Sequence, residues 1–157
     1  MAKKQKEKPS ITVNNEEFFI DGLLDREHSE YYENGQLKSE EYFQVGIRNG
    51  RSIFWHENGQ KGQDCNYIND KVEGIFTSWY ENGQKHKVMN YIDDKLQGVF
   101  TSWHSSGEII FEFNCKNGLR NGECSMWHEN GQIKSLENFI DEKRDGEQTY
   151  WNEDGEI

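Results

Sequence analysis

The sequence is short of apolar residues, of proline and of basic charge. Only 32% of its 157 residues are hydrophobic and its mean hydropathy is -1.07, whereas a compact globule has an apolar share of roughly 45–50% with glycine included. No apolar run approaches the roughly 20 residues of a membrane span, and no signal-peptide core opens the chain. The composition therefore leaves two classes, a disordered chain and a thin fold that buries little per residue.

Acidic residues outnumber basic ones, 29 against 18, which gives a net charge of -11. Lys3, Lys4, Lys6 and Lys8 give the first ten residues a charge of +3, so the remainder carries -14. A body this acidic repels phosphate backbones and anionic lipid. It attracts basic proteins, with a faster encounter at low salt. We therefore expect a protein partner of basic character, and neither nucleic acid nor membrane as the main ligand.

Cysteines are few and aromatic residues are many. Cys65, Cys115 and Cys124 are an odd number without close metal spacing, which predicts reduced thiols and a cytoplasmic setting. Five Trp, seven Tyr and nine Phe exceed what a disordered polar chain carries. The aromatic content thus favours the thin, ordered fold.

An internal repeat of 24 residues determines the architecture. Glu-Asn-Gly-Gln and its two weaker copies recur without insertion or deletion at 33–36, 57–60, 81–84, 105–108, 129–132 and 153–156. Tryptophan keeps the same phase at Trp55, Trp79, Trp103, Trp127 and Trp151. A second glycine series follows at Gly50, Gly74, Gly98, Gly122 and Gly146. The turn motif, the tryptophans and the second glycine series all keep the same period and phase, and together they define a tandem repeat.

Each unit reads as strand, tight turn, strand and looser turn. Asn-Gly between β-branched and aromatic runs predicts a type I′ hairpin turn, which needs positive φ at both central residues. The turn glycines are Gly35, Gly59, Gly83, Gly107, Gly131 and Gly155. A looser turn near Asp70-Lys71 would set three pairs of residues opposite each other across adjacent strands: Tyr67 with Phe76, Tyr91 with Phe100, and Cys115 with Cys124.

The predicted fold class is all-β, an elongated single-layer antiparallel sheet of hairpin repeats. Stacking supplies each marginal hairpin with neighbouring strands. We expect a basic disordered tail over 1–12, an atypical capping half-repeat over 13–30 and tandem repeats over 31–157. Equivalent residues of successive repeats should lie roughly 10 Å apart, two strand spacings.

The repeated motif resembles that of a known family. The pattern Gly-x4-Trp-[His/Tyr]-Glu-Asn-Gly-Gln-x6-Tyr, as in Gly74 to Tyr91, is similar to the MORN-repeat variant found in many bacterial proteins. Chains of this size with such repeats resemble the YwqK-family antitoxins. The resemblance covers about Glu30 to Ile157, and departs at Ser105-Ser106 and at Cys115. It implies a MORN-like meander that binds another protein, without catalytic residues.

Side chains that could carry chemistry have simpler structural interpretations. His56, His104 and His128 share one column, but roughly 10 Å between neighbouring members of a column is too far for ligands of one ion. Cys115 and Cys124 either pair or are two small buried thiols in apolar columns. No nucleophile motif and no glycine-rich nucleotide loop is present. We therefore expect no catalytic residue, no cofactor and no metal site.

The predicted function is a non-catalytic protein-interaction module, antitoxin-like or immunity-like, that binds through an aromatic, acidic sheet face. Trp and Tyr dominate interface hot spots. The candidate contact residues are Trp55, Trp79, Tyr80, Trp103, His104, Trp127, Phe76 and Phe100. The alternative is a structural scaffold at a membrane or cell envelope, contacted by the basic tail. Self-association through strand edges is compatible with either.

Overall fold

The computed structural model describes residues 11–14 and 17–157, with side chains from Phe19 onward. Most of the basic tail predicted over 1–12 lies outside the described residues. Residues 13–30, predicted as a capping half-repeat, hold β2 and parts of β1 and β3. Every regular element among the described residues is a strand, and no helix there is long and apolar enough to cross a membrane.

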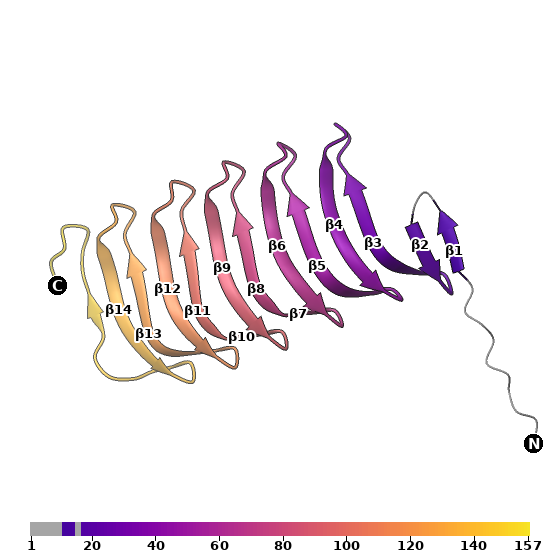
Figure 1. Cartoon of the computed structure of the whole chain (residues 1–157). Helices are drawn as coiled ribbons and strands as arrows, with labels where there is room; N and C mark the ends of the chain where they lie inside the picture. The colour runs from indigo at the N-terminus through magenta and orange to yellow at the C-terminus, as the bar shows by residue number, and fades with distance from the viewer. Residues whose placement is uncertain (1–10, 15–16) are drawn as a thin grey trace, which may run out of the picture.

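The described part of the chain forms one antiparallel sheet of 16 strands. The chain passes from strand to strand as an open meander, and the hairpins stack into an elongated single layer (Figure 1). This confirms the predicted all-β repeat fold. The strands are β1 (Ile11–Asn14), β2 (Glu17–Ile20), β3 (Leu23–Tyr31), β4 (Leu37–Gln44), β5 (Ile47–Trp55), β6 (Lys61–Ile68), β7 (Lys71–Val72), β8 (Gly74–Trp79), β9 (Lys85–Ile92), β10 (Lys95–Leu96), β11 (Gly98–Trp103), β12 (Ile109–Lys116), β13 (Leu119–Trp127), β14 (Ile133–Ile140), β15 (Lys143–Arg144) and β16 (Thr149–Tyr150).

The prediction of type I′ turns at Asn-Gly was wrong. In the second repeat Gly59 has a φ of 82°, while Asn58 is not among the residues with positive φ. The Gly59 N–H donates to the His56 carbonyl at 2.9 Å and the His56 N–H donates to the Gln60 carbonyl at 2.8 Å. This is a three-residue loop, a type I turn followed by a glycine bulge. We call the side of the sheet that these loops form the Asn-Gly edge.

The opposite edge carries two-residue turns, at the positions where the sequence predicted the looser turns. Asn69 and Asp70 have φ values of 51° and 63°, and the flanking residues Ile68 and Lys71 are paired. Asp93-Asp94 and Asp141-Glu142 repeat the same conformation. Positive φ at both central residues is the type I′ geometry. We call this side of the sheet the two-residue-turn edge.

The predicted cross-strand pairs at this edge were also wrong. The residue opposite Tyr67 is Val72, and the one opposite Cys115 is Arg120. Further from the turn the register shifts by two residues, so that Asp64 pairs with Thr77. The extra residues form a bulge that contains the second glycine series, whose φ is positive at every member. The corresponding partner of Tyr91 is Leu96, and Cys124 lies opposite Phe113.

Strand alternation divides the side chains between two faces. The buried face carries Cys65, Phe76 and the residues at multiples of 24 positions from them, which include Ser52. The open face carries Ile75, Thr77, Trp79 and the residues at multiples of 24 positions from these. Most of the buried side chains belong to the buried face, and the long strands of the sheet are bent along their length (Figure 1). The buried face includes Ser39, Ser52, Cys65, Tyr67, Met89, Ser102, Cys115, Cys124, Ser135, Glu137 and Phe139, each at most 8% exposed.

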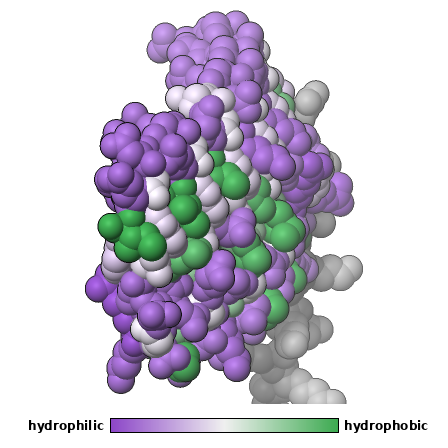
Figure 2. Space-filling view, turned by 90° about the vertical axis from the view of Figure 1, so that its left-hand side faces the viewer, coloured by the Kyte–Doolittle hydropathy of each residue, from purple (hydrophilic) through white to green (hydrophobic). Residues whose placement is uncertain are grey.

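Small side chains account for the thin core. The least exposed residues are serines, with Ser39 at 0% and Ser52 at 1%. A single layer has no second sheet to cover large side chains, so complete burial is reached mainly by small ones. Seen from the C-terminal end, apolar residues gather between hydrophilic edges of the molecule (Figure 2).

Candidate protein-interaction surfaces

The tryptophan column runs along the open face beside the Asn-Gly edge. Trp55, Trp79, Trp103 and Trp127 end the strands that precede the loops, and all are half-buried. Lysines of the preceding repeat cover two of the rings. The Lys61 Nζ lies 5.9 Å from the centre of the Trp79 ring, and the Lys85 Nζ lies 6.0 Å from that of Trp103. The rings thus pack across repeats and keep part of their surface in solvent.

The side chain after each tryptophan joins one repeat to the next. The Tyr80 hydroxyl donates to the Trp103 carbonyl at 2.8 Å, and Tyr32 does the same to Trp55 at 2.7 Å. The His56 Nε2 lies 2.9 Å from the Trp79 carbonyl. Tyr80 and His104, both predicted contact residues, are half-buried. The polar end of Tyr80 is therefore engaged within the sheet.

The Asn-Gly-Gln motif also links repeats. The Asn58 side chain accepts from the Gln60 N–H at 3.0 Å and donates to the Glu81 carbonyl of the next repeat at 2.6 Å. The Gln60 side chain lies against Gly83 of that repeat, where a Cβ atom would collide with its Oε1. The residues of this motif thus hold successive repeats together.

A groove opens between two of the tryptophans. It has a volume of about 400 Å³ and is lined by Trp79, Gly83, Gln84, Lys85, Trp103 and Gly107. The two rings belong to successive repeats, and glycines at 83 and 107 leave the loops without side chains that would fill the space. The groove combines aromatic walls with a lysine and an amide, which suits a side chain of a partner protein.

The eight predicted contact residues do not form one surface. Phe76 lies three residues before Trp79, so alternation puts the two on opposite faces. Phe76 meets Tyr91 edge to face at 6.4 Å between ring centres, and Phe100 packs at 5.0 Å from Phe113. The tryptophans stand on the open face, whereas Phe76 and Phe100 belong to the half-buried aromatic layer of the buried face.

Charged side chains concentrate at the two-residue-turn edge. The Arg48 N–H and its guanidinium both donate to the Asp70 carboxylate at 3.1 Å, and these bonds lower the pKa of Asp70. The Arg120 N–H donates to Glu142 at 2.7 Å, and this bond is the main cause of the lowered pKa of Glu142. Each carboxylate holds the turn of one repeat against the preceding repeat.

The thiols and histidines have mainly structural surroundings. Burial raises the pKa of the Cys65, Cys115 and Cys124 thiols, all of which are free. A raised pKa leaves little thiolate, the form that reacts and binds metals. Within residues 11–14 and 17–157, no group of three or more His, Cys, Asp or Glu side chains could hold a metal ion.

Sequence reasoning missed one surface on the open face. A row of asparagines, Asn66, Asn90, Asn114 and Asn138, alternates there with variable side chains of the neighbouring strands. The sequence does indicate this row, because the asparagines recur every 24 residues. The variable members of the row are Arg51, Ile75, Val99, Glu123 and Glu147.

The repeat geometry agrees with the comparison of the sequence with known families. Three segments, residues 27–44, 72–93 and 120–141, match the MORN repeat variant. They contain β4, β9 and β14, three of the strands that end in two-residue turns, and the hairpin unit recurs between them. No curated protein matches the chain. The chain is therefore a tandem array that carries MORN repeats of the variant type.

Proposed function

We propose that this protein is a non-catalytic interaction module that binds a basic protein, in an antitoxin-like or immunity-like role. The observation that carries the proposal is the groove between Trp79 and Trp103. Half-buried tryptophans held by their neighbours are low-entropy anchors, and Trp is the residue most enriched at binding hot spots. The buried face consists largely of the core, so the open face offers the free surface.

The charge of the protein supports a basic partner. The net charge of -11 speeds the encounter with a positively charged protein and weakens contacts with acidic ones. Carboxylates of the two edges, such as Glu57, Glu81, Asp93 and Asp94, are exposed to solvent. The free, buried thiols are compatible with the reducing cytoplasm that we propose as its compartment.

The test is affinity capture from the native lysate at low and high salt, with mass spectrometry of the bound fraction. We expect one predominant basic protein, bound at low salt and released at high salt. The double variant Trp79→Leu and Trp103→Leu should lose it. Trp151→Leu is the matched control, because Trp151 holds the same position outside the groove and should retain the partner.

Folding of the variants must be verified before the capture is interpreted. Equal thermal unfolding midpoints for the double variant and the control separate loss of contact from loss of fold. Retention of the partner by a folded double variant would contradict binding at the groove. Capture of nothing but further copies of the chain, or of envelope lipid, would contradict the antitoxin-like role.

A further inference from the structure

Four aliphatic side chains form an exposed zigzag on the open face. They come from successive strands of the central repeats, and each lies diagonally across from the next. We call them the aliphatic zigzag: Ile68 on β6, Ile75 on β8, Ile92 on β9 and Val99 on β11, which are 49%, 58%, 53% and 48% exposed. A contiguous exposed apolar patch of this kind is uncommon on a monomer unless it binds something.

The other repeats show which residues can occupy the positions of the aliphatic zigzag. The preceding members of the same zigzag are Gln44 and Arg51, and the following ones are Lys116, Glu123, Ile140 and Glu147. Gln44, Arg51, Lys116 and Glu123 occupy strand positions equivalent to those of the aliphatic residues, so folding of the repeat does not require apolar residues there. Four consecutive aliphatic side chains occur in the middle of the open face, and Ile140, which is 53% exposed, follows after Lys116 and Glu123.

The spacing of the zigzag fits a helix that lies across the strands. Ile75 and Val99 are two strands apart, about 9.6 Å at 4.8 Å per strand. Side chains seven residues apart on a helix are about 10.5 Å apart at 1.5 Å per residue. A helix with aliphatic residues at i and i+7 can therefore place one beside each of them, with residues at i+3 or i+4 near Ile92.

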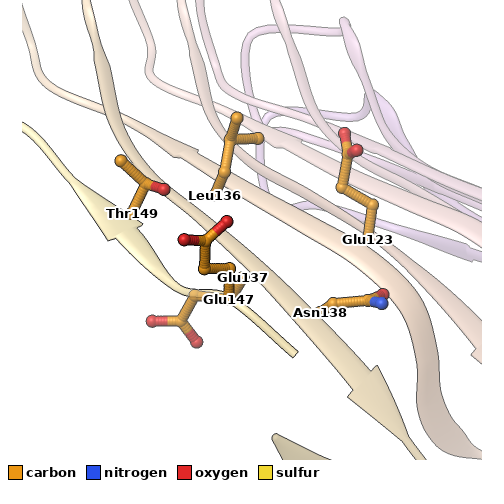
Figure 3. A pocket seen from close by; sticks show the side chains of 6 residues that line it. All are labelled: Glu123, Leu136, Glu137, Asn138, Glu147 and Thr149. Carbon is orange, nitrogen blue, oxygen red and sulfur yellow. The ribbon is translucent and has the colours of Figure 1, made fainter. Parts of the chain in front are cut away.

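An acidic cavity follows the zigzag toward the C-terminus. It has a volume of about 240 Å³ and lies over β13, β14 and the segment that leads into β16 (Figure 3). Its lining includes Glu123, Glu147 and Thr149. The Glu123 carboxylate accepts from the Ser125 hydroxyl at 3.2 Å. Among the described residues Glu147 has neither an ion pair nor a hydrogen bond from its side chain.

The neighbouring carboxylate of Glu137, which belongs to the buried face, is already neutralised. Glu137 accepts from the Tyr150 hydroxyl at 2.8 Å and pairs with Arg144 at 3.3 Å. Lys116 lies between Val99 and Glu123 in the zigzag, so the negative charge available to a ligand is centred further on, at Glu123 and Glu147. Each of these two carboxylates suits a basic side chain.

We propose that the open face docks an amphipathic helix of the partner protein, with aliphatic residues seven apart on the zigzag and a Lys or Arg in the acidic cavity. The cavity lies one to two repeats beyond Val99, so the basic residue follows roughly seven to fourteen positions after the second aliphatic one. This inference rests on the proposed protein-binding function and names the chemistry of the bound segment.

The test uses the full chain as bait for a displayed library of helical peptides of about 25 residues. We expect enriched peptides to carry two aliphatic residues seven apart and a basic residue toward one end. Their binding should fall at least tenfold with Val99→Glu, measured by fluorescence polarisation. The matched control is Val45→Glu, an exposed aliphatic residue in a two-residue turn outside the zigzag, which should bind as the wild type does.

Exchanging the charges of Glu147 and of the peptide's basic residue tests whether these two groups contact each other. Glu147→Lys should weaken the enriched peptides, and peptides whose basic residue is changed to Glu should recover binding to that variant. Enrichment of peptides that are insensitive to both Val99→Glu and Glu147→Lys would overturn the proposal but leave a protein-binding module. No enrichment at all would also overturn it, while capture from lysate would still test the proposed function separately. A dimer of the chain that Val99→Glu dissociates would show that a second copy covers the face instead.

Discussion

The two edges of the sheet achieve the same result by different chemistry. At the Asn-Gly edge neutral amides join the repeats, as when Asn58 donates to the Glu81 carbonyl. At the two-residue-turn edge carboxylates do so, as when Asp70 and Glu142 accept from the N–H groups of Arg48 and Arg120. The comparison teaches that the carboxylate links at Asp70 and Glu142 depend on pH, whereas the amide links do not. At the first edge four of the six repeats keep the sequence Glu-Asn-Gly-Gln, whereas the second edge has Asp, Glu or Gly at the second turn position.

The largest expected effect comes from a glycine of the bulge near the two-residue-turn edge. Gly50 has a φ of 139°, and a Cβ atom there would lie 2.8 Å from the Tyr42 Cβ. We expect Gly50→Ala to lower the free energy of unfolding by about 2–4 kcal/mol, since strain and overpacking add. The control is Gly74→Ala, which meets nothing within 4 Å at a φ of 79° and should cost about 1–2 kcal/mol. Equal losses in urea unfolding would contradict the bulge geometry.

Acid should weaken the two-residue-turn edge first. The pKa values of Asp70 and Glu142 are lowered by their bonds to Arg48 and Arg120. Their contribution to stability is complete above the unfolded-state values, about 3.9 for Asp and 4.3 for Glu, and is lost as the pH falls through the lower folded-state values. The double variant Asp70→Asn and Glu142→Gln should therefore unfold with a weaker dependence on pH below about pH 4.

Thermal unfolding midpoints from pH 7 to pH 2.5 measure this difference. Asn58→Ala is the control from the other edge, and its midpoint should fall in acid as steeply as that of the wild type. If the double variant keeps the wild-type acid dependence, the carboxylates do not hold this edge.

At the Asn-Gly edge one repeat lacks the side-chain amide that links repeats, and a single substitution can restore it. Ser106 stands where four of the other repeats have asparagine and the last has Asp154, and the amides of those asparagines bond to the next repeat. Restoring the amide by Ser106→Asn should stabilise the fold by about 0.5–1 kcal/mol, the net value of one hydrogen bond. Asn58→Ala should cost about 1 kcal/mol. Chemical unfolding of both variants checks the pair, and no gain at 106 would show that the amide ladder contributes nothing.

The smallest effect is expected for an exposed ion pair of the two-residue-turn edge. The Lys71 Nζ lies 3.2 Å from the Asp93 carboxylate, and both side chains are more than half exposed. Exposed pairs contribute little because water and salt screen them. Lys71→Ala should therefore change the unfolding free energy by less than about 0.5 kcal/mol. A loss above about 1 kcal/mol would mean that this pair belongs to the carboxylate ladder.

The period, the strands and the single layer could be predicted because they depend on spacing. Residues 24 apart must be equivalent, and Asn-Gly flanked by strand-forming runs marks a turn whatever its type. The turn types could not be predicted, because the Asn58 side chain bonds to Gln60 and Glu81 and thereby favours a loop that propensity alone does not single out. The predicted register was wrong because two residues near the second glycine series form a bulge and shift the pairing of the strands.

The candidate surface was predicted only in part. The three-residue spacing of Phe76 and Trp79 already implies opposite faces, so alternation could have divided the predicted set. The aliphatic zigzag was harder to find, since Ile75 and Ile92 resemble ordinary core residues in the sequence. Only the register between β8 and β9 and the measured exposure of these side chains identify them as surface.

The most direct test of the account is hydroxyl-radical footprinting of the chain with and without its captured partner. We predict that the partner lowers the oxidation of Trp79 and Trp103 and the labelling of Ile75 and Val99, while Trp151 is unchanged. This result would establish the open face as the binding face. Protection of Phe76 and Phe100 with Trp79 and Trp103 unaltered would contradict it and place the partner on the buried face.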